Sequence, residues 1–185
     1  MHIFVLFSRG EIARKMRFLQ IAAAFQKKML TLCPNYELMT PAFQWICDGV
    51  QLQGVDTRRL EQWIEQVVAA HNRFLGPVSY IFCNDDRILE VNRQFLNHDY
   101  FTDIITFDSP HGRVVSGDMF ISLDTVRTNA EQVGASYDRE LLRVIVHGIL
   151  HLCGINDKGP GEREIMERHE DEALAMLPAD IAPVR

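Results

Sequence analysis

The segment from Ser136 to Cys153 places the strongest constraint on the fold, because it is an apolar helix that carries two histidines. Ser136 is a typical N-cap residue, and Gly154 can end the helix in a left-handed conformation. The helix is expected to be deeply buried because its aliphatic side chains are Leu142, Ile145, Val146, Ile149, Leu150 and Leu152. Other elements therefore have to pack against it.

His147 and His151 lie four residues apart, so both imidazoles share one face of this helix and can reach one cation. Burying two imidazoles without partners costs several kcal/mol. The turn at Gly154 brings Asp157 back within reach. Two imidazoles and one carboxylate form a three-ligand zinc site with an open fourth position, which is typical of catalytic rather than structural zinc. We predict one zinc ion per chain, with His147, His151 and Asp157 as ligands and the two histidines as catalytic residues.

The spacing of these three residues is also that of the metzincin peptidases. Those enzymes need a glutamate directly after the first histidine to act as general base. Gly148 occupies this position here and has no side chain. The sequence therefore disfavours a peptidase of that kind.

Composition fits one globular domain of a soluble protein, with 47% hydrophobic and 24% charged residues in a chain of 185. No apolar run approaches the roughly 20 residues that span a bilayer. The net charge of −6 disfavours a large nonspecific nucleic-acid surface, so a nucleic acid would have to bind through a local patch. The widely spaced cysteines are expected to be buried thiols in a reducing compartment, and we expect the protein to be cytoplasmic. They are Cys33, Cys47, Cys83 and Cys153.

Residues 1–38 differ from the rest of the chain because they are basic. They are either an appendage that docks on RNA or protein, or sequence upstream of a true start at Met39. We favour the second explanation and expect the segment to pack poorly. Residues 39–178 are expected to form a metal-dependent hydrolase domain, and residues 179–185 a C-terminal tail.

The domain is expected to be α+β, with a mixed sheet of about four strands flanked by helices. The metal motif lies on the long buried helix and the loop after it. Periodicity and capping residues predict strands at 43–47, 78–82, 104–107 and 118–122. They predict helices at 57–74, 85–95, 124–133, 136–153 and 160–176, with Gly76 and Pro77 breaking the first.

The segment from His147 to Asp157 resembles the HGxLHLxGxDH signature of the YbeY endoribonucleases, which are bacterial zinc-dependent proteins of ribosomal RNA maturation. Residues 102–107 resemble the family's TDVLSF strand, and residues 117–122 its GDIxIS strand. The resemblance covers roughly residues 43–177. It implies a single-strand-specific, zinc-dependent endoribonuclease that acts in 3′-end maturation of small-subunit ribosomal RNA and in ribosome biogenesis. The small ribosomal subunit is then a partner.

The chain departs from the family pattern at two places. Asp157 replaces the usual third histidine, and an aspartate oxygen can still bind zinc at about 2.0–2.2 Å. Its charge makes a bound water less acidic or favours a harder metal such as manganese. Leu96 stands where the family's LN-x-x-YR segment, whose asparagine matches Asn92, has an arginine. Arg93 and Asp103 are weak candidates for substrate binding.

A second function from a different class is a metal-containing ribosome-biogenesis binding factor with little nuclease activity. The acidic composition and the missing arginine favour it, whereas the open three-ligand site argues against it. A general acid or base is not obvious from the sequence. Candidates are Glu140, Glu162 and Glu164.

Overall fold

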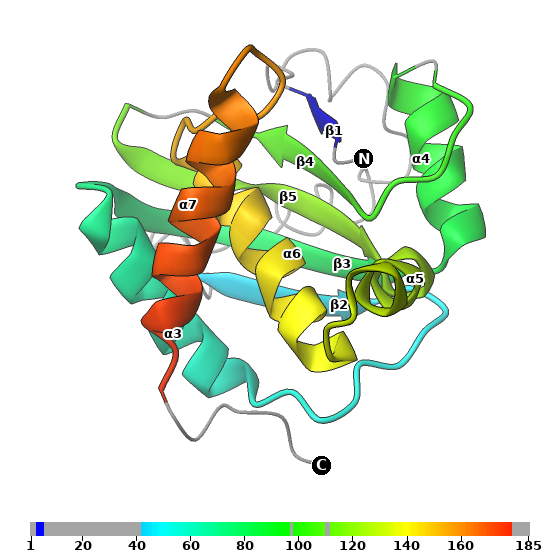
Figure 1. Ribbon diagram of the computed structural model, residues 1–185, viewed down its shortest axis with the longest axis horizontal. Helices are drawn as coiled ribbons and strands as arrows, with labels where there is room; N and C mark the ends of the chain where they lie inside the picture. The colour runs from blue at the N-terminus through cyan, green and yellow to red at the C-terminus, as the bar shows by residue number, and fades with distance from the viewer. Residues whose placement is uncertain (1–2, 6–41, 97, 110–111, 179–185) are drawn as a thin grey trace, which may run out of the picture.

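The computed structural model describes residues 3–5, 42–96, 98–109 and 112–178. Its five described strands form one mixed sheet in the order β1-β4-β5-β3-β2 (Figure 1). The strands are β1 (Ile3–Val5), β2 (Phe43–Cys47), β3 (Phe74–Cys83), β4 (Ile104–Asp108) and β5 (Val114–Ser122). Only β4 and β5 pair antiparallel; the other pairs are parallel. The predicted α+β class with a mixed sheet is confirmed.

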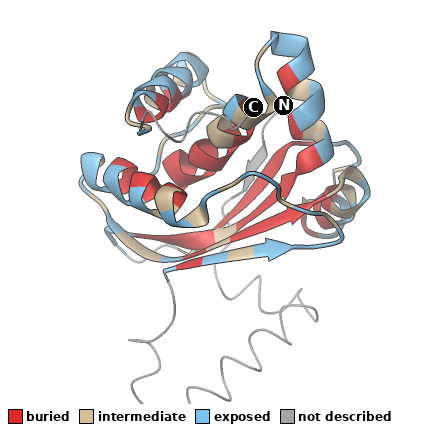
Figure 2. Ribbon diagram, turned by 90° about the horizontal axis from the view of Figure 1, so that it is seen from below, coloured by how far each residue is buried: buried red, intermediate tan, exposed pale blue. Residues whose placement is uncertain are grey.

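The described helices are α3 (Thr57–Ala70), α4 (Asp85–Leu96), α5 (Leu123–Val133), α6 (Tyr137–Leu152) and α7 (Glu162–Ala175). Helix α6 crosses the sheet between α7 and α5 (Figure 1). Successive strand residues point to opposite faces of the sheet, which therefore carries two cores. Tyr80 and Phe82 join the large core that includes α3, α6 and α7, whereas Ile81 and Cys83 pack with residues of α4. Figure 2 shows the buried strands with α6 against them.

Several element boundaries differ from those expected. Helix α3 ends at Ala70 rather than 74, and Asn72 has a positive φ of 55°. Strand β3 begins at Phe74 and continues past Gly76 and Pro77, because an irregularity between Leu75 and Val78 accommodates them in the pairing with β5. Strand β5 likewise begins earlier, at residue 114 rather than 118.

Two helices also begin at other residues than expected. Ser122, and not Asp124, caps α5 by accepting a hydrogen bond from the Thr125 backbone N–H. The last helix begins at Glu162 rather than Pro160, after Gly161 at a φ of 75°. The long α6 begins after Ser136 as predicted, and Gly154 has the left-handed φ of 95°.

The predictions for the N-terminal extension lie almost wholly outside the described residues. Within positions 1–38 the structure describes only β1, which pairs parallel with β4. Residues 179–185, the predicted tail, are also outside the described part. Among the described helices, none is both long and apolar enough to span a membrane.

The described cysteines are not all buried. Cys83 and Cys153 are buried, but Cys47 is exposed on β2, which corrects the expectation of buried thiols, and Cys33 is not among the described residues. Burial raises the pKa of Cys83 to about 12 and that of Cys153 to about 11. Both thiols therefore stay protonated and poorly nucleophilic at neutral pH.

This difference predicts selective thiol labelling. In the folded protein at mildly alkaline pH, an alkylating reagent should modify Cys47 and leave Cys83 and Cys153 unmodified. Peptide mass spectrometry with and without denaturant would check this. Labelling of Cys83 or Cys153 at the rate of Cys47 in the absence of denaturant would contradict it.

Candidate metal centre and cleft

Helix α6 presents the two histidines from a buried position, because Gly148 lets it lie close to the sheet. His147 and His151 are 1% and 2% exposed. A Cβ atom on Gly148 would lie 2.4 Å from Met119 Sδ on β5 and 2.8 Å from Ile104 Cδ1 on β4. Gly148 therefore faces the sheet, and the metzincin general base could not be placed here.

Each imidazole is held through its Nδ1 atom. His147 Nδ1 lies 2.6 Å from Glu170 Oε1, and His151 Nδ1 lies 2.8 Å from the Ile155 carbonyl oxygen. Because both partners accept, each Nδ1–H donates, and in a neutral imidazole this leaves the lone pair on Nε2. The Nε2 atoms of His147 and His151 each lie 3.8 Å from one of the two Asp157 carboxylate oxygens. The three side chains thus converge, as the sequence predicted they could.

The geometry and chemistry of this cluster fit a divalent metal ion. One ligand atom from each residue lies within 4.8 Å of the others. The 3.8 Å separations are too long for hydrogen bonds. They are close to the roughly 3.4 Å between ligands in a tetrahedral zinc site with bonds of about 2.1 Å. Among the described residues, no other group of three possible ligands is this close.

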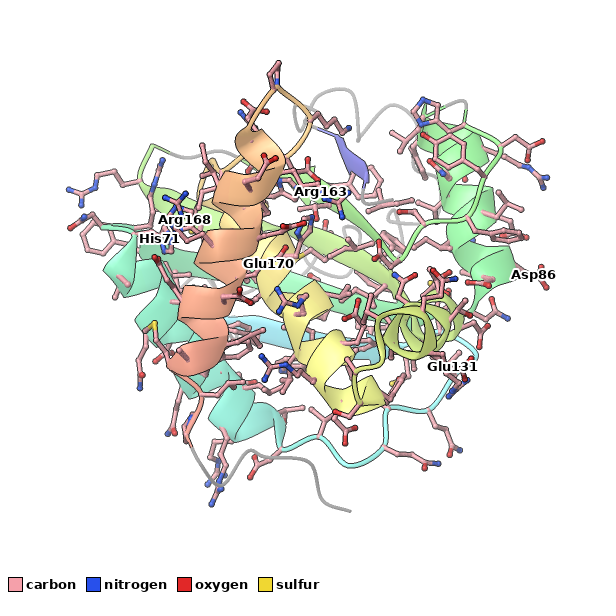
Figure 3. The ribbon with its side chains drawn as sticks, viewed as in Figure 1. His71, Asp86, Glu131, Arg163, Arg168 and Glu170 are labelled. Carbon is pink, nitrogen blue, oxygen red and sulfur yellow. The ribbon has the colours of Figure 1, made fainter. Side chains whose placement is uncertain are left out.

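Glu170 on α7 is a site residue that the sequence reasoning missed. It is 3% exposed and lies between α7 and α6 (Figure 3). Its second oxygen accepts a hydrogen bond from Arg143 Nη1 at 2.7 Å, and Arg143 Nη2 donates to Asp171 at 2.7 Å. Burial alone raises the pKa of Glu170, but His147 and Arg143 outweigh it and hold the pKa below its usual range. A carboxylate that orients a metal-binding histidine in this way fixes its tautomer and raises its basicity.

The sequence carries a signal for Glu170. Its spacing places it on one face of α7 with the apolar residues Met166, Ala173 and Leu174, and these four are the buried residues of that helix. A carboxylate in such a position needs a charged or hydrogen-bonding partner.

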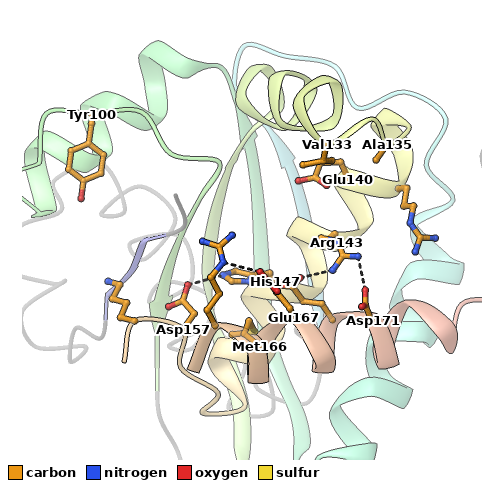
Figure 4. A pocket seen from close by; sticks show the side chains of 14 residues that line it. Tyr100, Val133, Ala135, Glu140, Arg143, His147, Asp157, Met166, Glu167 and Asp171 are labelled. Atoms are coloured by element: carbon orange, nitrogen blue, oxygen red, sulfur yellow. Dashed lines mark hydrogen bonds and ion pairs between the residues drawn. The ribbon is translucent and has the colours of Figure 1, made fainter. Parts of the chain in front are cut away.

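A cleft of about 790 Å³ opens beside the cluster (Figure 4). His147 and Asp157 line it, as do residues of α6, α7 and the loop between them. Its cations are Arg139, Arg143, Lys158 and Arg163, and its carboxylates are Glu140, Asp157, Glu167, Glu170 and Asp171. With four cations against five carboxylates, a bound divalent ion would change the net charge of the lining from −1 to +1. The cleft would then suit an anionic substrate despite the acidic composition of the chain.

The two weak substrate-binding candidates lie outside the lining of the cleft. Exposed Arg93 forms an ion pair with Asp99 at 2.6 Å. Asp103 is fully buried and accepts hydrogen bonds from the Ile104 backbone N–H and from Asn129. Both residues instead hold the segment between α4 and β4.

The remaining candidates also differ in position. Glu140 lines the cleft. Glu162 does not, and its carboxylate accepts a hydrogen bond from the Gly159 backbone N–H, whereas Glu164 is exposed outside the lining. Leu96, at the position of the family arginine, packs against the core shared with α4.

The chain matches a known protein family. The family model described as endoribonuclease YbeY matches residues 47–178. The chain belongs to the YbeY endoribonuclease family. It is 64% identical over 129 residues to endoribonuclease YbeY of Bacteroides thetaiotaomicron, which covers 70% of this chain and 94% of the relative. With endoribonuclease YbeY of Parabacteroides distasonis it shares 57% identity over 139 residues, covering 75% and 98%.

A solved structure shares the fold of this chain. The solution structure of a Thermotoga maritima protein superimposes with a TM-score of 0.51 at 27% identity, covering 72% of this chain and 89% of that one. The family match includes all three residues of the candidate metal centre and Glu170.

Proposed function

We propose that this chain is a cytoplasmic, single-strand-specific, zinc-dependent endoribonuclease with one zinc ion per chain. Its proposed role is 3′-end maturation of small-subunit ribosomal RNA and ribosome biogenesis. The observation that carries the proposal is the His147–His151–Asp157 cluster beside a cleft with four cations, in a chain of the YbeY family.

Each residue of the cluster has its own proposed role. His147, His151 and Asp157 would hold the metal and leave a fourth position for a ligand. A zinc ion there would activate water for attack on phosphorus and neutralise charge that develops on the phosphoryl oxygens. Glu170 accepts from His147 Nδ1–H and so keeps Nε2 of His147 directed toward Asp157, where it would bind the metal. Of the carboxylates considered from the sequence as general acid or base, Glu140 is the one that lines the cleft.

The test is an RNA cleavage assay on the purified chain, with metal content measured on the same sample. The substrates are a small-subunit ribosomal RNA fragment with a single-stranded 3′ extension and the same fragment with that extension paired to a complementary strand. We expect one zinc per chain, cleavage of the unpaired extension only, loss of cleavage after chelation, and recovery when zinc is returned.

A His147→Ala variant purified in parallel controls for contaminating nucleases and should be inert. If the purified chain carries zinc but leaves both substrates intact, the nuclease proposal is wrong. Binding of small ribosomal subunits by that inert protein would then favour the binding-factor function. If activity returns with manganese but not with zinc, the zinc assignment is wrong and the nuclease proposal stands. The Asp157 oxygen is a ligand that also suits a harder metal.

A further inference from the structure

The loop between α4 and β4 holds an aromatic surface at the edge of the cleft. Tyr100 lines the cleft and is 36% exposed. The His98 ring stacks against Tyr100, with centroids 5.1 Å apart and an interplanar angle of 20°. His98 Nδ1 and the Tyr100 hydroxyl also lie within hydrogen-bond distance, at 3.1 Å. The tyrosine is therefore supported on one side by a second ring.

Buried residues hold the backbone of this aromatic surface in place. Asn92 of α4 is fully buried, and its Nδ2 donates a hydrogen bond to the Tyr100 carbonyl oxygen at 2.8 Å. Thr102 and Asp103, which follow Tyr100, are 1% and 0% exposed. Because these buried contacts fix the backbone at Tyr100 and directly after it, the ring has a fixed point of attachment, and less entropy is lost when a ligand binds.

The position of the ring relative to the metal ligands indicates what it contacts. In Figure 4, Tyr100 stands on the opposite side of the view from Val133, Ala135 and Glu140, and Asp157 lies beside His147. A strand bound along this cleft would therefore contact both Tyr100 and the cluster, because both line it. Proteins commonly bind unpaired bases by stacking them on aromatic rings beside a groove that carries cations, because every base has a face that can stack.

We propose that Tyr100, supported by His98, is a stacking platform for one unpaired base of the RNA substrate. This inference rests on the proposed nuclease function and adds a source for its strand selectivity. A base within a duplex is already stacked and paired, so the platform excludes it, and stacking discriminates little among the four bases. The platform would also give the substrate a contact near α4. On that helix, Leu96 stands at the position of the family arginine and packs against the core.

The test places 2-aminopurine at successive positions of a short single-stranded RNA and measures its fluorescence on binding to the zinc-loaded chain. Stacking on Tyr100 should quench the fluorescence at one position. Tyr100→Ala should abolish that quenching and raise Kd about tenfold or more. Tyr100→Phe keeps the ring and should behave like the wild type.

Two controls separate stacking from damage to the loop. Phe101→Ala removes a neighbouring ring that is 53% exposed and does not line the cleft, and it should leave Kd unchanged. An abasic nucleotide at the quenched position should weaken binding to the wild type as much as Tyr100→Ala does, and should not weaken binding to Tyr100→Ala further.

The other possible results of these assays separate failure of the stacking platform from failure of the nuclease proposal. If the wild type binds and cleaves the RNA but Tyr100→Ala does so equally well, the platform is wrong and the nuclease proposal stands. If Tyr100→Phe loses binding as Tyr100→Ala does, the hydroxyl rather than the ring face makes the contact, and stacking is wrong. If the wild type neither binds nor cleaves single-stranded RNA, both proposals fail.

Discussion

Replacing Glu170 with glutamine is expected to weaken zinc binding by about 10–100-fold, the usual effect of losing a carboxylate behind a metal-binding histidine. The substitution preserves size but removes the charge that accepts from His147 at 2.6 Å and from Arg143 at 2.7 Å. A glutamine amide can accept from one of these donors only by directing its NH₂ group at the other. Competition with a zinc chelator of known affinity would measure the change.

Asp171→Asn is the matched control for Glu170→Gln. Asp171 also accepts from Arg143 at 2.7 Å, but its side chain is 66% exposed, so its ion pair is screened by solvent. Zinc affinity should therefore hardly change. If Glu170→Gln binds zinc as tightly as the wild type, then Glu170 does not position His147. Circular dichroism on both variants would show that neither effect reflects unfolding.

Replacing Gly148 with glutamate is expected to prevent stable folding. The new side chain would start 2.4 Å from Met119 Sδ and continue into the packed contact between α6 and the sheet. An uncompensated buried charge typically lowers the free energy of unfolding by about 3–5 kcal/mol, a large part of the stability of a domain. Urea denaturation followed by circular dichroism would measure the loss.

Val133→Glu introduces the same side chain at a position that is 68% exposed, and it should change the free energy of unfolding by no more than about 0.5 kcal/mol. A Gly148→Glu protein as stable as this control would show that α6 does not lie against β4 and β5 as described. The pair thus tests why this fold carries glycine where metzincins carry their base.

The parts that local sequence decides were predictable. Ser136 and Gly154 mark the ends of α6 by capping and by left-handed backbone geometry, which need no distant partner. The convergence of His147, His151 and Asp157 follows from helical spacing and one turn, so it could be anticipated as well.

The remaining features depend on partners that are distant in the chain. Local signals read Gly76 and Pro77 as breakers, yet β3 continues through them because Leu75 pairs with Val115 of β5. Glu170 meets His147 across 23 positions, and only the packing of α7 on α6 brings them together. Tyr100 reaches the cleft because buried Asn92 holds its loop, a contact that periodicity does not reveal.

The residues proposed to bind the metal, and Glu170 that orients His147, all belong to the α6–α7 hairpin. The Tyr100 loop reaches the cleft from between α4 and β4. Contacts that are close in the chain cost little loop-closure entropy, and those between distant segments cost more. Assembly of the proposed metal ligands therefore depends on contacts within one helical hairpin, whereas the proposed contact with a base also needs the segment between α4 and β4. If Tyr100 is a stacking platform, sequence change in its loop would alter which strands bind and would leave the proposed metal ligands in place.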